Sequence, residues 1–185
     1  MKLSRERENA ERSGRAKKEA RPTTGMVSGA LFNILTAAGL IAGARFLDLF
    51  SGTGKVAAAA MKHGAAFVLA VESERDRAER ISSLLSDFGD AALCVRADVR
   101  RTLPKLERDE AVFDVIFADP PYGLGWGEVL PSMIAERASI LSPGGAFVME
   151  RAARDAVLDP PGGIFLPRDD RLYGGTALSI YRKNQ

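Results

Sequence analysis

The chain has 185 residues, 46% of them hydrophobic and 27% charged, a balance typical of a folded globular protein rather than a disordered or membrane-spanning one. No apolar run approaches the roughly 20 residues that a membrane helix needs, and charges stand where a secretory signal would be apolar, so we expect a cytoplasmic protein without membrane contact. One cysteine, Cys94, excludes an internal disulfide and a thiolate metal cluster.

The charge is distributed unevenly along the chain. Residues 1–25 carry eight basic side chains and four acids, a net charge of +4, so the remaining 160 residues sum to about −2. Residues 1–20 have almost no apolar side chain and are predicted to form a charged tail ahead of one domain, 21–185. Such a tail either contacts a polyanion by neutralising phosphates or is a solvated arm without a partner, and the composition fits both.

A helix is predicted after this tail, in "RPTTGMVSGALFNILTAAG", residues 21–39. Pro22 interrupts any preceding helix, and Thr23 or Thr24 can cap the new one. Its apolar residues recur at helical spacing: Val27, Leu31, Ile34, Leu35 and Ala38. One face of this helix is therefore expected to pack on the domain.

Strands and helices alternate from Arg45 onward. Strands are predicted at 45–50, 67–72, 92–98, 113–119 and 145–151, and helices at 54–63, 75–88, 99–107 and 128–141. This alternation predicts an α/β fold, a parallel sheet with helices on both faces. Residues 163–183 hold two strand-like runs without a helix between them, so the last pair should be antiparallel. Ligands of such sheets gather beyond the carboxyl ends of the strands.

The first strand leads into "DLFSGTG", residues 48–54. Gly52 and Gly54 allow a tight turn and a close approach of the backbone to a ligand, as in nucleotide-binding loops. The motif is weak by itself. Asp48, an acid inside the strand ahead of the glycines, distinguishes it from a dinucleotide-binding fingerprint.

Acidic residues also end the next two strands. Glu72 ends the second strand, 18 residues after Gly54, where a carboxylate can accept hydrogen bonds from both hydroxyls of a ribose. Asp98 ends the third strand. It is placed either to receive an adenine amino group or to cap the following helix, and the sequence leaves both open.

The fourth strand ends in "DPPY", residues 119–122. Proline fixes its own φ and lacks an N–H donor, so Pro120 and Pro121 predict a rigid turn with exposed carbonyl oxygens. Asp119 is acceptor-only when ionised, and with the Pro120 carbonyl it forms a pair of acceptors for an exocyclic NH2. Tyr122 offers a flat face on which a base can stack, a contact worth about 1–3 kcal/mol. The motif is therefore interpreted as a clamp for an aryl amine, and holding that amine beside an electrophile can supply about 7–11 kcal/mol of a reaction barrier.

At these residues the sequence resembles the S-adenosylmethionine-dependent amino-methyltransferases, and more narrowly the RsmD-type bacterial enzymes that methylate guanine N2 in 16S ribosomal RNA. The likeness covers about 21–183. It depends on "RPTT" followed by "ALFNIL", on "FLDLFSGTGKVAAAAMKHGA", "VLAVESE" and "FDVIFADPPYG", on the late strand ending in Glu150, and on a final hairpin ending in "YRK".

The resemblance implies a Rossmann-like sheet of seven strands with the last strand inserted antiparallel, and direct methyl transfer without a metal. It implies cofactor contacts from Asp48, Phe50, Gly52, Gly54, Glu72, Ser73, Asp98, Val99 and Asp119. It implies catalytic roles for Asp119, Pro120, Pro121 and Tyr122. It implies substrate contacts from Arg21, Thr23, Thr24 and Tyr122, with small-subunit ribosomal RNA or the assembling 30S subunit as partner of a monomer.

The chain departs from the family pattern in two places. It has a charged tail where members begin with a glycine- and arginine-rich hairpin, and after "RPTT" it has Gly25, Met26, Ser28 and Gly29 where charges are typical. Both lie on the side expected to meet RNA. Two alternatives therefore stay open: an amino-methyltransferase acting on DNA adenine or a small molecule, and an inactive RNA- or ribosome-binding module of the same fold.

Overall fold

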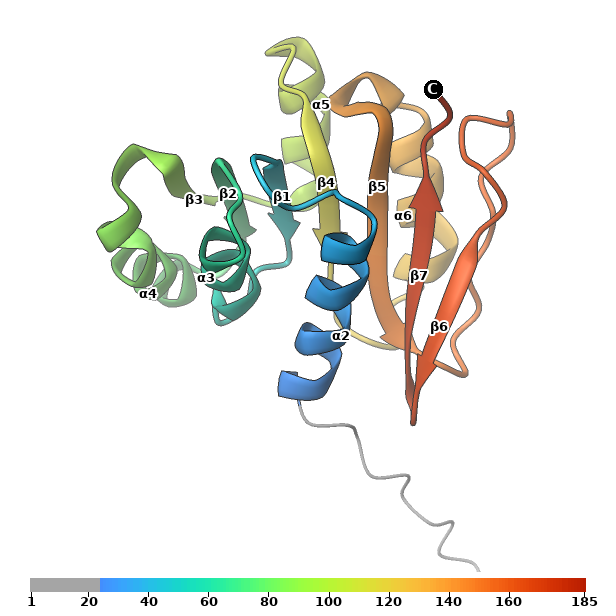
Figure 1. Cartoon of the computed structure of the whole chain (residues 1–185), viewed down its shortest axis with the longest axis horizontal. Coiled ribbons are helices and arrows are strands. Elements are labelled where there is room, and N and C mark those ends of the chain that lie inside the picture. Colours follow the sequence, from blue (N-terminus) through green and yellow to red (C-terminus); the bar gives the residue numbers. More distant parts are fainter. Residues whose placement is uncertain (1–23) are drawn as a thin grey trace, which may run out of the picture.

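The computed structural model describes residues 24–185, and the predicted tail, Arg21 and Thr23 lie outside this range. The strands are β1 (Arg45–Leu49), β2 (Phe67–Glu72), β3 (Ala92–Arg96), β4 (Phe113–Ala118), β5 (Leu141–Ala152), β6 (Asp169–Tyr173) and β7 (Thr176–Arg182). Within the described range they form one seven-stranded sheet in the order β3-β2-β1-β4-β5-β7-β6 (Figure 1). β1 to β5 pair in parallel, and β7 lies antiparallel between β5 and β6. The predicted mixed sheet with an inserted antiparallel strand is confirmed.

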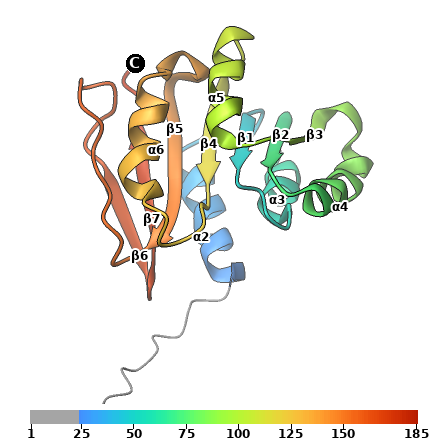
Figure 2. The same cartoon turned by 180° about the vertical axis from the view of Figure 1, so that it is seen from behind.

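Helices cover both faces of this sheet. They are α2 (Thr24–Ala37), α3 (Lys55–Lys62), α4 (Arg75–Leu85), α5 (Val99–Arg108) and α6 (Trp126–Ala135), with 3-10 turns at Ser86–Ala91 and Ala138–Ile140. α2 and α3 lie in front of the sheet in Figure 1, and α5 and α6 come to the front when the molecule is turned (Figure 2). The predicted layers are therefore observed.

Each face of the sheet has its own core, because successive strand residues point to opposite sides. In β1, Phe46 joins the core beneath α2, α3 and α4, whereas Leu47 and Leu49 join the core beneath α5 and α6. The four residues Phe46–Leu49 are all buried, as expected for a parallel strand covered on both sides. The position of the carboxyl end of β1 is thereby fixed from two directions.

The boundaries of α4 and α6 and the buried face of α2 differ from the prediction. α4 ends at Leu85 rather than at 88, and the 3-10 turn that follows contains Gly89 at φ 57°, a value that an α-helix excludes. α6 begins two residues early, at Trp126, because Gly125 at φ 69° turns the chain directly into the helix. In α2, Phe32 is fully buried although it was not among the predicted apolar positions, and Ala38 is exposed just beyond the end of the helix.

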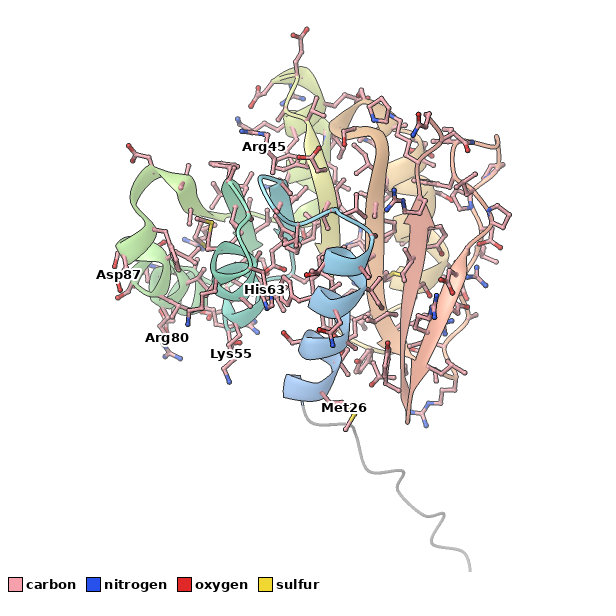
Figure 3. The ribbon with its side chains drawn as sticks, in the orientation of Figure 1. Met26, Arg45, Lys55, His63, Arg80 and Asp87 are labelled. Atoms are coloured by element: carbon pink, nitrogen blue, oxygen red, sulfur yellow. The ribbon has the colours of Figure 1, made fainter. Side chains whose placement is uncertain are left out.

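The carboxyl ends of β1, β2, β4 and β5 all meet at the lower edge of the sheet in Figure 1, and α2 begins at the same edge. Figure 3 shows Met26, near the start of α2, at this edge and Arg45, which begins β1, at the opposite one. The structure contains no helix in 24–185 that is long and apolar enough to cross a bilayer.

Candidate active site

The loop after β1 turns through three residues with positive φ. These are Phe50 at 61°, Gly52 at 55° and Gly54 at 73°. Positive φ is strained for a bulky residue such as phenylalanine, and such strain is found mainly at functional sites. Ser51 anchors the loop, because its hydroxyl donates to the Asp48 carbonyl at 2.8 Å and accepts the Val71 N–H at 3.0 Å.

Glu72 closes this loop from the neighbouring strand. Its Oε2 accepts the Gly52 N–H at 2.9 Å, and its Oε1 accepts the Glu74 N–H at 2.8 Å. The side chain is 6% exposed, and the nearest guanidinium, of Arg77, lies 3.7 Å away. A carboxylate offers about four acceptor sites, so Glu72 is held in place by backbone donors and keeps acceptor capacity for a ligand.

A first hollow of about 470 Å3 opens between the loop and the ends of β2, β3 and β4. This volume lies in the range of about 300–1,000 Å3 that small-molecule sites occupy. Its predicted lining residues are Phe50, Gly52, Glu72, Ser73, Asp98 and Val99. Asp119 and Pro121 line it from the end of β4. The structure therefore brings most of the predicted cofactor residues to one cavity.

Asp98 serves as the N-cap of α5, because its Oδ1 accepts the Arg100 N–H at 2.8 Å, and it also lines the first hollow. Arg100 extends over the indole of Trp126, with its guanidinium carbon 4.1 Å from the ring centroid, a cation–π contact. Trp126 in turn meets Phe50 edge to face, with ring centroids 4.8 Å apart. One wall of the hollow is thus aromatic and carries a cation.

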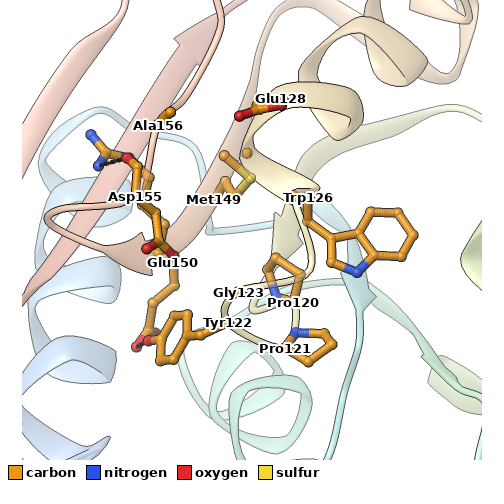
Figure 4. A pocket seen from close by; sticks show the side chains of 13 residues that line it. Pro120, Pro121, Tyr122, Gly123, Trp126, Glu128, Met149, Glu150, Asp155 and Ala156 are labelled. Carbon is orange, nitrogen blue, oxygen red and sulfur yellow. Dashed lines mark hydrogen bonds between the residues drawn. The ribbon is translucent and has the colours of Figure 1, made fainter.

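A second hollow of about 320 Å3 lies on the other side of the diproline corner (Figure 4). It is lined by Pro120 and Tyr122 from the corner and by Met149 and Glu150 from β5. Pro121 and Trp126 line both hollows. The corner therefore separates two adjacent cavities, and ligands bound in them would lie next to each other at the corner.

The far wall of the second hollow is held by Arg151. This buried guanidinium binds the Ser179 hydroxyl at 2.8 Å, the Asp170 carboxylate at 2.9 Å and the Asp155 carbonyl at 3.1 Å. The segment 153–158 is also fixed to α6, where the Gly127 carbonyl accepts the Leu158 N–H at 3.1 Å. The wall is thus attached both to the C-terminal strands and to the first turn of α6.

Two predicted cofactor residues do not line either hollow. Asp48 is 1% exposed, and its Oδ2 has no hydrogen-bond partner among the described residues. Burial, with a smaller contribution from Asp119, raises the pKa of Asp48 to about 7. Gly54 is the N-cap of α3, and a Cβ there would lie 3.0 Å from Ile81. Asp48 and Gly54 thus lie behind the wall of the first hollow, and their contacts with a cofactor stay predictions.

Several residues at the hollows were not predicted. Arg77 and Arg100 follow the strand-end acids by five and two residues, and the early turns of α4 and α5 bring them back to the first hollow. Trp126, which the sequence left open as either a lid residue or a cover for the core edge, begins α6, packs in the core and lines both hollows. Thr24 begins α2, but its side chain lies outside the described part. No group of three or more His, Cys, Asp or Glu in 24–185 is placed to hold a metal ion.

Comparison with known proteins gives both a family and a fold. The family model described as Conserved hypothetical protein 95 matches residues 12–182. YlbH of Bacillus subtilis, named as a candidate rRNA methyltransferase, is 28% identical over 165 residues, 88% of each chain. The Escherichia coli protein yhhF, named as a candidate methyltransferase, superposes with a TM-score of 0.75 at 22% identity and covers 90% of this chain and 89% of its own. SMU.776, a candidate methyltransferase complexed with SAH, gives 0.66 at 18% identity over 85% of this chain and 48% of its own. At these identities the two structures show the shared fold.

Proposed function

This chain belongs to the Conserved hypothetical protein 95 family, and we propose that it is an S-adenosylmethionine-dependent methyltransferase acting on ribosomal RNA, at the exocyclic N2 amine of a guanine in the small subunit. YlbH, which matches most of the chain, is named for rRNA methylation. SMU.776, which shares the fold, carries SAH, the product that remains when S-adenosylmethionine has lost its methyl group. The first supports methylation of rRNA and the second supports the cofactor, whereas the guanine N2 amine and the small subunit come from the resemblance to the RsmD-type enzymes.

The observation that carries the proposal is that one cavity collects Gly52, Glu72, Asp98 and Asp119, while the diproline corner divides it from a second cavity. The first hollow fits S-adenosylmethionine in size and in chemistry. Glu72 offers carboxylate oxygens for the ribose hydroxyls, and Asp98 lies beside Val99, where an adenine would meet a polar and an apolar side chain. Gly52 has no atom other than the Phe50 carbonyl oxygen within 4 Å of its absent Cβ, so a ligand can approach its backbone.

The second hollow receives the target base in this proposal. A base that undergoes chemistry must leave its stack and enter a pocket, where aromatic side chains hold its face. Tyr122 offers such a face, and the Pro120 carbonyl and the Asp119 carboxylate accept the two protons of the amine. Directed hydrogen bonds of this kind help the amine nitrogen to pyramidalise and free its lone pair for attack.

S-adenosylmethionine, when bound, supplies a methyl group on positively charged sulfur: as the N2 lone pair bonds to the methyl carbon, the sulfur–carbon bond breaks and its electron pair stays on sulfur. The protein has to align the amine, exclude water from the contact and accept the proton that N2 releases. Pro121 and Trp126, which line both hollows, form the boundary at which the two reactants meet. Asp119 is exposed, so its carboxylate gives the proton a route to solvent.

The test is transfer of a labelled methyl group to small ribosomal subunits, naked rRNA and DNA in parallel, followed by identification of the modified nucleoside. Labelled N2-methylguanosine from the small subunit is the expected result. N6-methyladenine would instead support the DNA-type alternative, and no transfer to any substrate would support the inactive binding module.

A matched pair of variants tests the clamp itself. Asp119→Asn removes the charge from one acceptor, and hydrogen bonds to charged groups contribute about 1.5–3 kcal/mol, so methyl transfer should fall by about 10- to 100-fold. SAH affinity, measured by calorimetry, should change by less than about threefold, because the other lining residues of the first hollow remain. Asp87→Asn is the control, since Figure 3 shows Asp87 beyond α4, far from the corner. Equal methyl-transfer activities of the two variants would contradict the role of Asp119 as an acceptor for the amine.

A further inference from the structure

Glu150 places a carboxylate beside the diproline corner. It lies in β5, is half-buried and lines the second hollow. Its Oε1 accepts the Tyr122 hydroxyl at 3.4 Å. Figure 4 shows the two side chains together on one side of the hollow, away from Trp126. The amine clamp and the stacking ring therefore have a further acceptor next to them.

We propose that Glu150 is a specificity-determining residue, which admits guanine by accepting the hydrogen of its ring N1. The inference rests on the proposed function, in which Asp119 and the Pro120 carbonyl hold an exocyclic amine in this place. An ionised carboxylate accepts hydrogen bonds and donates none. Any base that enters must therefore present a donor toward Glu150.

Guanine is the base that meets this requirement. Its N1–H stands next to the carbon that bears the N2 amine, so two kinds of donor face the protein along one edge. In adenine the ring nitrogen beside the amine is N1, an acceptor, and in cytosine it is N3, also an acceptor. A carboxylate that faces either nitrogen leaves both acceptors unpaired, and burying an unsatisfied polar group is costly.

The backbone around Glu150 is fixed, as is required of a residue that discriminates between bases. In the register of the sheet Glu150 pairs with Leu178 of β7, inside an unbroken run of pairs from Ala146 to Ala152. The next residue, Arg151, is buried and bound to Ser179 and Asp170. The side chain of Glu150 thus leaves a rigid strand, and the Tyr122 hydroxyl, which donates to it, directs it toward the corner.

The experiment uses base analogues at the mapped target nucleotide. One RNA or reconstituted subunit carries guanine there, and the other carries 2,6-diaminopurine, which keeps the 2-amine but has an unprotonated N1. The wild-type protein should methylate guanine with a kcat/KM about 10- to 100-fold above that for diaminopurine, because one charge-assisted hydrogen bond is lost. Glu150→Gln should lower the rate on guanine and bring the ratio close to one, since an amide can turn either its oxygen or its NH2 toward the base.

Two measurements separate this role from a structural one. SAH affinity and the midpoint of urea unfolding of Glu150→Gln should match those of the wild type, because Glu150 does not line the first hollow. Glu79→Gln, an exposed change on α4 that removes a surface ion pair, should leave the guanine preference intact. Tyr122→Phe keeps the ring but removes the donor to Glu150, so it should lower the preference partly.

Two results would overturn the inference while the proposed function stands. One is equal wild-type rates on guanine and diaminopurine. The other is a Glu150→Gln variant that keeps the full preference, whether or not it slows both substrates by the same factor. The wild-type comparison needs no variant, so a folding defect of Glu150→Gln cannot remove the test. If the wild type methylates no guanine amine in any substrate, the proposed function itself fails.

Discussion

Replacing Gly54 with alanine should destabilise the fold more than replacing Gly52. Both glycines have positive φ, 73° and 55°, and an L-residue in this region loses about 1–2 kcal/mol. At Gly54 the new methyl group would also lie 3.0 Å from Cγ1 of Ile81 and 3.2 Å from Leu84. Ile81 is fully buried and cannot move aside, and overpacking of a core costs about 1–3 kcal/mol. At Gly52 the nearest atom, the Phe50 carbonyl oxygen, is 3.8 Å away, which is an ordinary contact.

The expected losses in the free energy of unfolding are therefore about 2–5 kcal/mol for Gly54→Ala and about 1–2 kcal/mol for Gly52→Ala. Urea unfolding at 25 °C, with an unchanged m-value, measures both. SAH affinity should show the reverse order, since Gly52 lines the first hollow and Gly54 does not. If Gly54→Ala is the milder change in stability, or if it alone abolishes SAH binding, the assignment of Gly54 to helix packing is wrong.

Three further changes give separate tests. Burial raises the pKa of Asp48 to about 7, so the stability of the wild type relative to Asp48→Asn should be greatest below about pH 4. The wild type should lose about 2–4 kcal/mol of this relative stability as the pH rises from there through 7. Urea unfolding across pH measures the difference, and a parallel pH dependence of the two proteins would contradict the prediction. A methyl group at Gly127 would collide with the Ala156 carbonyl, so Gly127→Ala should lose methyl transfer yet retain SAH affinity in calorimetry, and normal transfer would show that this wall can shift. Gly29 lies exposed inside α2, and among the described residues no atom lies within 4 Å of where its Cβ would stand. Gly29→Ala should therefore raise the unfolding free energy by about 0.5–1 kcal/mol in urea, and a decrease would contradict this reasoning.

The fold was predictable because its signals are local. Short apolar strands separated by helical segments occur along 45–151, and the run from Phe113 to Ala118 with prolines after it marks the end of β4 without any knowledge of contacts. The resemblance to the RsmD-type family is confirmed by the family match. Helix ends were less predictable. α4 passes into a 3-10 turn at Ser86, and the positive φ of Gly125 starts α6 two residues early, and neither feature is recorded by periodicity.

The candidate site was predictable where a residue stands at a strand end. Gly52, Glu72, Asp98 and Asp119 each follow from this rule, and parallel strands bring them to one edge. The second hollow was not foreseen as a cavity, because its walls come from segments far apart in the chain, 120–128 and 149–156. Nor did the sequence indicate that Gly54 packs against α4, since both glycines fit the same motif equally well.

The antiparallel insertion of β7 has a consequence for synthesis of the chain. β6 precedes β7 in sequence, yet β7 lies between β6 and β5 in the sheet. On the ribosome, β6 is thus synthesised before β7, the strand that joins it to the sheet. The edge of β5 that pairs with β7 stays unpaired while residues 153–175 are synthesised. At about 5–20 residues per second this interval lasts about one to five seconds. An uncovered edge is prone to intermolecular pairing, so truncated or stalled chains that lack β7 should be the aggregating species.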